Sequence, residues 1–138
     1  MLTKDPRYSW EAYVLIYKVM DFMQAEKGLE PGDPRGHVTG QQLLEALRVH
    51  ARRTYGCDAR RKLNSLGIYT CEDVGEIVFN LVDHGLLRKT DRDSREDFKN
   101  GYDFARVFPG PLSNMASVWF WVLVLSLILL FLILKMGD

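Results

Sequence analysis

Apolar side chains recur every three or four residues over most of residues 6–84, which is the spacing of one face of an α-helix. Residues typical of helix ends divide this stretch. Thr39 with Gln42 forms the pattern of a capping box, Thr70 precedes acidic residues that favour a helix start, and glycines stand where helices should end. The pattern therefore predicts four helices, over residues 6–27, 39–55, 58–66 and 70–84.

The periodicity changes after Gly85. Residues 86–98 carry β-favouring alternation around the turn Asp91-Arg92-Asp93, which predicts a small β-hairpin. A Pro-Gly-Pro sequence then interrupts regular structure. We expect a mainly α-helical domain with a short hairpin over residues 1–108, followed by a Pro/Gly linker over residues 109–114.

In the C-terminal segment, polar residues do not recur at helical spacing. Residues 115–134 contain no charge, and 14 of the 19 residues from Ala116 on are Leu, Ile, Val or Phe. A helix of 20 residues is about 30 Å long, which matches the hydrocarbon core of a bilayer. Trp119 and Trp121 near one end and Lys135 at the other are suited to the membrane interfaces. The pattern predicts a transmembrane helix over residues 115–135 and a short tail over 136–138.

The alternative for this segment is a buried core helix, which should show a polar face. Ser117 and Ser126 are its only polar side chains apart from the indoles. No apolar stretch precedes the segment, so we expect no signal peptide. We expect the segment to insert into the membrane only after synthesis of the chain has ended, which gives a tail-anchored, single-pass topology. The N-terminal domain is then expected in the cytoplasm, at the inner (cytoplasmic or intracytoplasmic) membrane.

The net charge of the chain argues against one class of function, nucleic-acid binding. The chain has 18 basic and 18 acidic residues, and Lys135 and Asp138 are the only ones beyond position 114. The domain is therefore charge-balanced, without the overall basicity of a nucleic-acid binder. We expect the lipid bilayer and other membrane subunits as partners, and nucleic acid as an unlikely one.

Basic residues nevertheless cluster locally. Between residues 48 and 62 six positive charges stand against one carboxylate, Asp58, and the expected hairpin carries more. Such residues are often only solvated helix faces. They also suit anionic headgroups, an acidic protein surface or, less well here, DNA phosphates. The candidate partner or headgroup surface comprises Arg48, Arg52, Arg53, Arg60, Arg61, Lys62, Arg88, Arg92 and Arg95.

No pattern of catalytic or metal-binding residues is present. His37, His50 and His84 occupy positions typical of structural histidines, and the sequence contains no phosphate loop, nucleophile elbow or His-Glu-x-x-His pattern. Cys57 and Cys71 match no metal or redox spacing, and we expect them reduced. We therefore expect that the protein is not an enzyme and that it has no metal site and no small-molecule substrate.

The apolar segment also lacks strong ligands. It contains no His, Cys, Asp, Glu, Asn or Gln, and no small-x-x-x-small pattern for self-association. We expect no cofactor of its own, although pigment tails or lipids can contact its bulky side chains.

Three helices followed by a charged hairpin resemble a winged-helix domain, with residues 81–88 similar to its last helix and the start of its wing. The amino-acid sequence of residues 7–108 also resembles that of a family of small uncharacterised bacterial proteins of unknown function. This resemblance implies a compact cytosolic domain, to which the apolar tail has been added. The segments that carry it are 37–48, 66–82, 85–98 and 100–104.

Two functions follow as hypotheses. The first is a non-catalytic accessory subunit of a bacterial multi-subunit membrane complex, with a photosynthetic reaction centre or a respiratory electron-transport complex favoured as host. The second is a membrane-tethered winged-helix regulator that binds DNA through its basic residues. An enzyme tethered to lipid is a third class, for which the sequence offers no motif.

Overall fold

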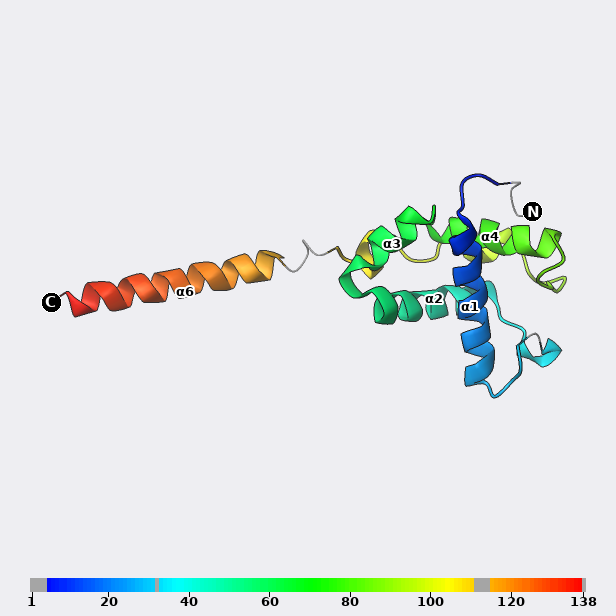
Figure 1. Ribbon diagram of the computed structural model, residues 1–138, viewed down its shortest axis with the longest axis horizontal. Coiled ribbons are helices and arrows are strands. Elements are labelled where there is room, and N and C mark those ends of the chain that lie inside the picture. The colour runs from blue at the N-terminus through cyan, green and yellow to red at the C-terminus, as the bar shows by residue number, and fades with distance from the viewer. Residues whose placement is uncertain (1–4, 32, 111–114, 138) are drawn as a thin grey trace.

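The computed structural model describes residues 5–31, 33–110 and 115–137. This part of the chain is mainly helical and contains no strand (Figure 1). Its elements in order are α1 (Trp10–Glu26), η1 (Pro34–Gly36), α2 (Gly40–Tyr55), η2 (Gly56–Asp58), α3 (Ala59–Ser65), α4 (Cys71–Asp83), η3 (Arg95–Phe98), α5 (Phe104–Val107) and α6 (Met115–Met136), where η marks a 3-10 helix.

The first five α-helices form one body around a shared apolar core, and α6 is drawn apart from them (Figure 1). Helix α1 packs on both α2 and α4, α3 packs on α2, and η3 fills the angle between α2 and α4. The largest fully buried side chains of this core are Ile16, Val19, Leu44, Leu47, Leu63, Ile68, Val74, Ile77 and Phe108.

Helix α1 begins later than the sequence pattern indicates. It starts at Trp10 rather than at Pro6, because the Ser9 side chain accepts a hydrogen bond from the Ala12 amide at 3.3 Å and caps it there. Trp10, the first residue of the helix, is 65% exposed. The predicted start of this helix at Pro6 is therefore wrong.

The capping box predicted at the start of α2 is confirmed, and so is the predicted start of α4 after Thr70. Thr39 accepts from the Gln42 amide at 3.2 Å, while the Gln42 side chain accepts from the Thr39 amide at 3.1 Å. Thr70 and Asp73 form the same reciprocal pair at the start of α4, at 3.3 and 3.0 Å. These bonds satisfy amides that the first turn of a helix leaves without partners.

A close backbone approach joins the N-terminal segment to the α3–α4 connection. The Ser9 amide donates to the Leu66 carbonyl at 3.1 Å. Gly67 follows with φ of +94°, and a Cβ at this position would overlap the carbonyl oxygen of Arg7. Both the conformation and the contact require glycine here.

The hairpin over residues 86–98 is not confirmed in the described part of the chain. The Asp93 carboxylate accepts from the Thr90 amide at 2.7 Å and closes a local turn. Ser94 then caps η3, and its own amide donates to Asp97 at 2.8 Å. These local side-chain bonds satisfy the backbone without a strand ladder, so the wing of the expected winged helix is not formed.

Residues 102–108, which include α5, contain a cluster of aromatic rings. The rings of Tyr102 and Phe108 both pack on Phe104, with centroids 5.7 and 5.2 Å away. The Tyr102 hydroxyl donates to the Leu44 carbonyl at 2.8 Å. This cluster fixes the end of the domain against α2, which determines where the chain leaves toward α6.

Candidate functional site

Helix α6 is the one helix among the described residues that is long and apolar enough to cross a membrane. Its candidate span, Ser117–Met136, has a mean hydropathy of 2.8 and is 0% buried. The alternative of a core helix therefore finds no support in the structure. The indoles of Trp119 and Trp121 are 60% and 62% exposed, as interface anchors would be, and Lys135 lies in the last turn.

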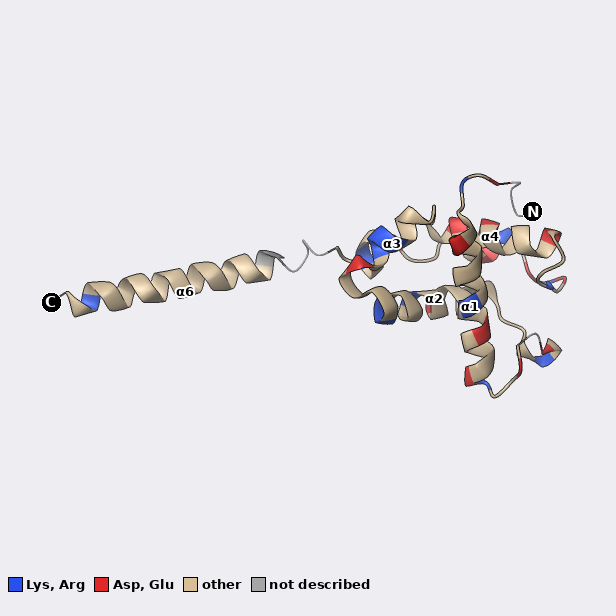
Figure 2. Ribbon diagram, in the orientation of Figure 1, with Lys and Arg blue, Asp and Glu red and all other residues tan. Residues whose placement is uncertain are grey.

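Five of the predicted basic residues gather where α2 meets α3. Arg52 and Arg53 lie in the last turn of α2, and Arg60, Arg61 and Lys62 follow the first residue of α3. Figure 2 shows Lys and Arg on these two segments, at the end of the domain from which the chain continues toward α6. We call these five residues the basic surface.

The helix periodicity turns the basic surface toward solvent. Ala51, Ala59 and Leu63 are buried where α2 and α3 pack together, so their charged neighbours project outward. Asp58 is the single carboxylate between residues 48 and 62, and it pairs with Arg61 at 2.9 Å.

The remaining charges of the basic surface stay largely uncompensated. The exposed Arg52, Arg53 and Lys62 and the half-buried Arg60 make no ion pair with another described residue. The charge of Lys62 interacts with the Glu11 carboxylate at longer range. The charge of the basic surface is therefore largely available to a partner outside the domain.

Arg60 places the basic surface beside the exit of the chain from the domain. A Cβ on Gly110 would lie 3.7 Å from Nη2 of Arg60, so the guanidinium adjoins the last described residue before α6. Helix α6 begins five residues later, at Met115. Five residues reach at most about 18 Å when fully extended, so the basic surface lies close to the N-terminus of α6.

The other predicted basic residues do not join this surface. Arg48 is paired with Glu45 at 2.8 Å on α2 itself. Arg95 pairs with Glu76 at 3.1 Å and lies over the Phe79 ring at 4.6 Å, which ties η3 to α4. These two side chains have structural partners.

Arg88 and Arg92 lie in the segment that follows α4, at the end of the domain opposite α3 (Figure 1). The nine residues grouped from the sequence thus separate into the basic surface, two paired side chains and a distant pair. The separation follows from the course of α4, which carries the chain across the domain.

The histidines and cysteines are dispersed. His37 Nε2 lies 3.2 Å from Asp93, and His84 Nδ1 lies 2.7 Å from the carbonyl oxygen of Asn80, a contact within the end of α4. Among the described residues, no three His, Cys, Asp or Glu side chains lie close enough together to hold a metal ion.

The two cysteines are both free and differ in exposure. Cys57 is exposed in η2, which connects the two helices that carry the basic surface. Cys71 is buried, donates to the Tyr102 carbonyl at 3.4 Å, and has a raised pKa because burial disfavours its thiolate.

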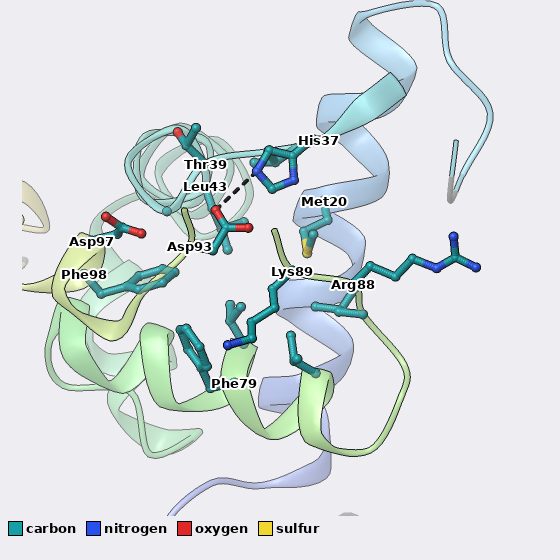
Figure 3. Close-up of a pocket in the computed structure, with 15 residues that line it drawn as sticks. Met20, His37, Thr39, Leu43, Phe79, Arg88, Lys89, Asp93, Asp97 and Phe98 are labelled. Atoms are coloured by element: carbon teal, nitrogen blue, oxygen red, sulfur yellow. Dashed lines mark hydrogen bonds and ion pairs between the residues drawn. The ribbon is translucent and has the colours of Figure 1, made fainter. Parts of the chain in front are cut away.

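A small cavity that the sequence did not indicate lies between the start of α2, α4 and the segment that runs from α4 into η3, with one side chain from α1 (Figure 3). Met20 and Phe79 line it, and Lys89 lies over the Phe79 ring at 5.6 Å. Its volume is about 40 Å³. A water needs roughly 10–15 Å³ of such space, so the cavity has room for a few waters and not for a cofactor.

The His37–Asp93 contact closes one side of this cavity (Figure 3). Partial burial opposes ionisation of Asp93, but hydrogen bonds from Thr90 and the nearby His37 outweigh it and lower the pKa of this carboxyl. The contact joins the segment before α2 to the turn after α4, so its evident role is structural.

A wider depression opens beside the cavity, with a volume of about 510 Å³. Its walls come from α1, η1 and the segment after α4, with Asp21, Gln24 and Arg88 among its polar side chains. Sequence reasoning missed it because these segments are far apart in the chain and none carries a recognisable motif.

Comparison of the chain with family models, curated proteins and solved structures found no match. The resemblance to small uncharacterised bacterial proteins therefore stays a prediction.

Proposed function

We propose that the protein is a single-span, non-catalytic accessory subunit of a membrane protein complex. The observation that carries the proposal is α6, 22 residues long, with its candidate span wholly unburied. Burial of apolar surface is worth about 25 cal/mol per Å², so a helix of this kind needs lipid or other apolar helices around it. The α6 helix anchors the chain, and the domain contacts neighbouring subunits at the membrane surface.

Exposed aromatic side chains on the domain support contact with other subunits. Trp10 is 65% exposed and Tyr69 is 60% exposed. The hydrogen bond from Ser9 to Leu66 brings the segments that carry them together. Trp and Tyr dominate the energetic centres of protein interfaces, because they bury a large area at little conformational cost.

Solubilisation in mild detergent tests this function. The chain should co-purify with other membrane subunits in a fixed ratio, and photosynthetic and respiratory complexes are the first hosts to examine. A Trp10→Ala, Tyr69→Ala variant should lose partners while remaining in the membrane fraction; Tyr17→Ala, at an exposed position elsewhere on α1, is the matched control. Migration of the wild-type chain as a lone monomer would contradict the proposal.

The uncompensated basic surface favours one second function, a membrane-tethered DNA-binding regulator. Such binding must weaken steeply with salt, because phosphate contacts release counterions. A salt-dependent gel shift by the detergent-solubilised chain would support it. The missing wing and the distant Arg88 and Arg92 leave fewer groups on one face to contact a duplex than a winged helix uses.

A further inference from the structure

We propose that the basic surface binds the anionic headgroups of phospholipids in the leaflet that α6 enters. The inference deepens the proposed function, since it rests on α6 crossing the bilayer. The residues involved are Arg52, Arg53, Arg60, Arg61 and Lys62.

The short connection between the domain and α6 keeps the basic surface near the bilayer. Helix α6 is 22 residues long, or about 33 Å, against a hydrocarbon core of about 30 Å, so Met115 lies near the core boundary. Gly110, beside Arg60, lies within about 18 Å of that point along the chain. The headgroup layer occupies roughly 5–8 Å of this distance. Gly110 and the adjoining Arg60 therefore lie in the headgroup layer or within about 10–13 Å beyond it, a distance comparable with the Debye length of about 8–10 Å.

The charge of the basic surface is complementary to an anionic membrane. The basic surface holds five cations, of which Arg61 alone has an ion pair in the described part of the chain, with Asp58, while the Glu11 carboxylate interacts with Lys62 at longer range. Arg and Lys at an anionic membrane surface each stabilise binding about fivefold. Guanidinium groups also form paired hydrogen bonds with phosphate oxygens, which suits four of the five side chains.

The tether favours lipid over a protein as the occupant. Headgroups surround α6 at every moment, whereas an acidic subunit surface is present only in a particular assembly. The segment after α4, which carries Arg88 and Arg92, lies at the opposite end of the domain from α3 (Figure 1). In this arrangement it stays away from the bilayer and serves as an internal control.

Cys57 provides the probe. It is exposed between the two helices that carry the basic surface, while Cys71 is buried, so a neutral thiol-reactive fluorophore labels Cys57 selectively in the folded chain. The labelled full-length chain is placed in nanodiscs of phosphatidylcholine alone, or with about one third phosphatidylglycerol to supply the anionic surface. Quenching by acrylamide, a neutral aqueous quencher, then reports how freely water reaches the label.

The phosphatidylglycerol discs should reduce the quenching constant at least about twofold, and high salt should restore it, because salt screens the attraction. The variant Arg52→Gln, Arg53→Gln, Lys62→Gln should lower the docking equilibrium about a hundredfold and abolish the protection. Its control, Arg88→Gln, Lys89→Gln, Arg92→Gln, removes the same charge from the other end of the domain and should leave the protection unchanged.

Equal quenching in the two kinds of disc would overturn the proposal, as would equal effects of the two triple variants. Protection that appears only in native membranes, and never in discs, would assign the surface to a protein and overturn it too. A chain that fails to enter discs at all would instead contradict the membrane anchor, so the two failures are distinguishable. Circular dichroism confirms that each variant is folded.

Discussion

Replacing Gly67 by alanine tests the packing of the N-terminal segment on the domain. Gly67 has φ of +94°, and a Cβ there would overlap the carbonyl oxygen of Arg7. Gly85 is the matched control, because it has φ of +71° and no atom within 4 Å of its would-be Cβ. Both substitutions strain the backbone, but only Gly67→Ala also forces two segments apart.

The magnitudes differ accordingly. Alanine in a left-handed conformation costs about 1–2 kcal/mol, and this is the whole effect expected for Gly85→Ala. At Gly67, displacement of Arg7 also weakens the Ser9–Leu66 hydrogen bond, worth about 0.5–1.5 kcal/mol, and adds about 1–3 kcal/mol of repacking. We expect Gly67→Ala to lower the free energy of unfolding by about 3–6 kcal/mol.

The assay is urea unfolding of the full chain in mild detergent, followed by circular dichroism. Helix α6 stays in the micelle, so the transition reports the domain. Equal losses of stability in the two variants would refute the close approach of Arg7 to Gly67. A loss at Gly67 that exceeds the loss at Gly85 by about 2 kcal/mol or more would support it.

Three further outcomes are expected. The Arg7 guanidinium lowers the pKa of Asp5 from 3.8 to about 2, so the stability that this ion pair adds above pH 3.8 should be lost as the pH falls toward 2. In a plot of the free energy of unfolding against pH, Asp5→Asn should reduce the slope over this range. Cys57 should react with a thiol reagent in the folded chain, and Cys71 only after unfolding, which time-resolved labelling in increasing urea checks. Tyr8→Phe should lower the free energy of unfolding by about 1.5–3 kcal/mol, because the hydroxyl donates to the Asp73 carboxylate at 2.7 Å, whereas Tyr69→Phe, at an exposed position, should change it little in the same urea titration.

Structural features that depend on residues close together in the chain could be predicted from the sequence. The helix starts at Thr39 and Thr70 depend on bonds between residues three apart, so the local pattern was sufficient. The apolar residues of α6 likewise indicate its length and character without any knowledge of the domain.

The segment after α4 was mispredicted because tertiary contacts compete with its alternating pattern. Asp93 and Ser94 bind nearby backbone groups, and Phe98 is buried against Gly75, where a Cβ would meet the ring at 2.8 Å. A residue without a side chain in the middle of α4 thus receives an aromatic ring from η3. Sequence spacing cannot indicate that pair, 23 positions apart.

For the basic surface, too, the local sequence predicts some features, while others depend on tertiary packing. Sequence reasoning identified its residue types, but it joined Arg88 and Arg92 to the cations of α2 and α3. Their separation depends on how α4 crosses the domain, and the nearness of Arg60 to Gly110 depends on the aromatic cluster that fixes the chain's exit. Both are properties of packing and not of local sequence.

Alkaline carbonate extraction of membranes that contain the full chain tests the central claim most directly. The expected result is that the chain stays in the membrane pellet, while a Leu125→Arg, Leu129→Arg variant, with each arginine disfavouring insertion by about 3 kcal/mol, is released. Release of the wild-type chain into the supernatant would contradict a membrane-spanning α6, and with it the proposed place of the domain at the lipid surface.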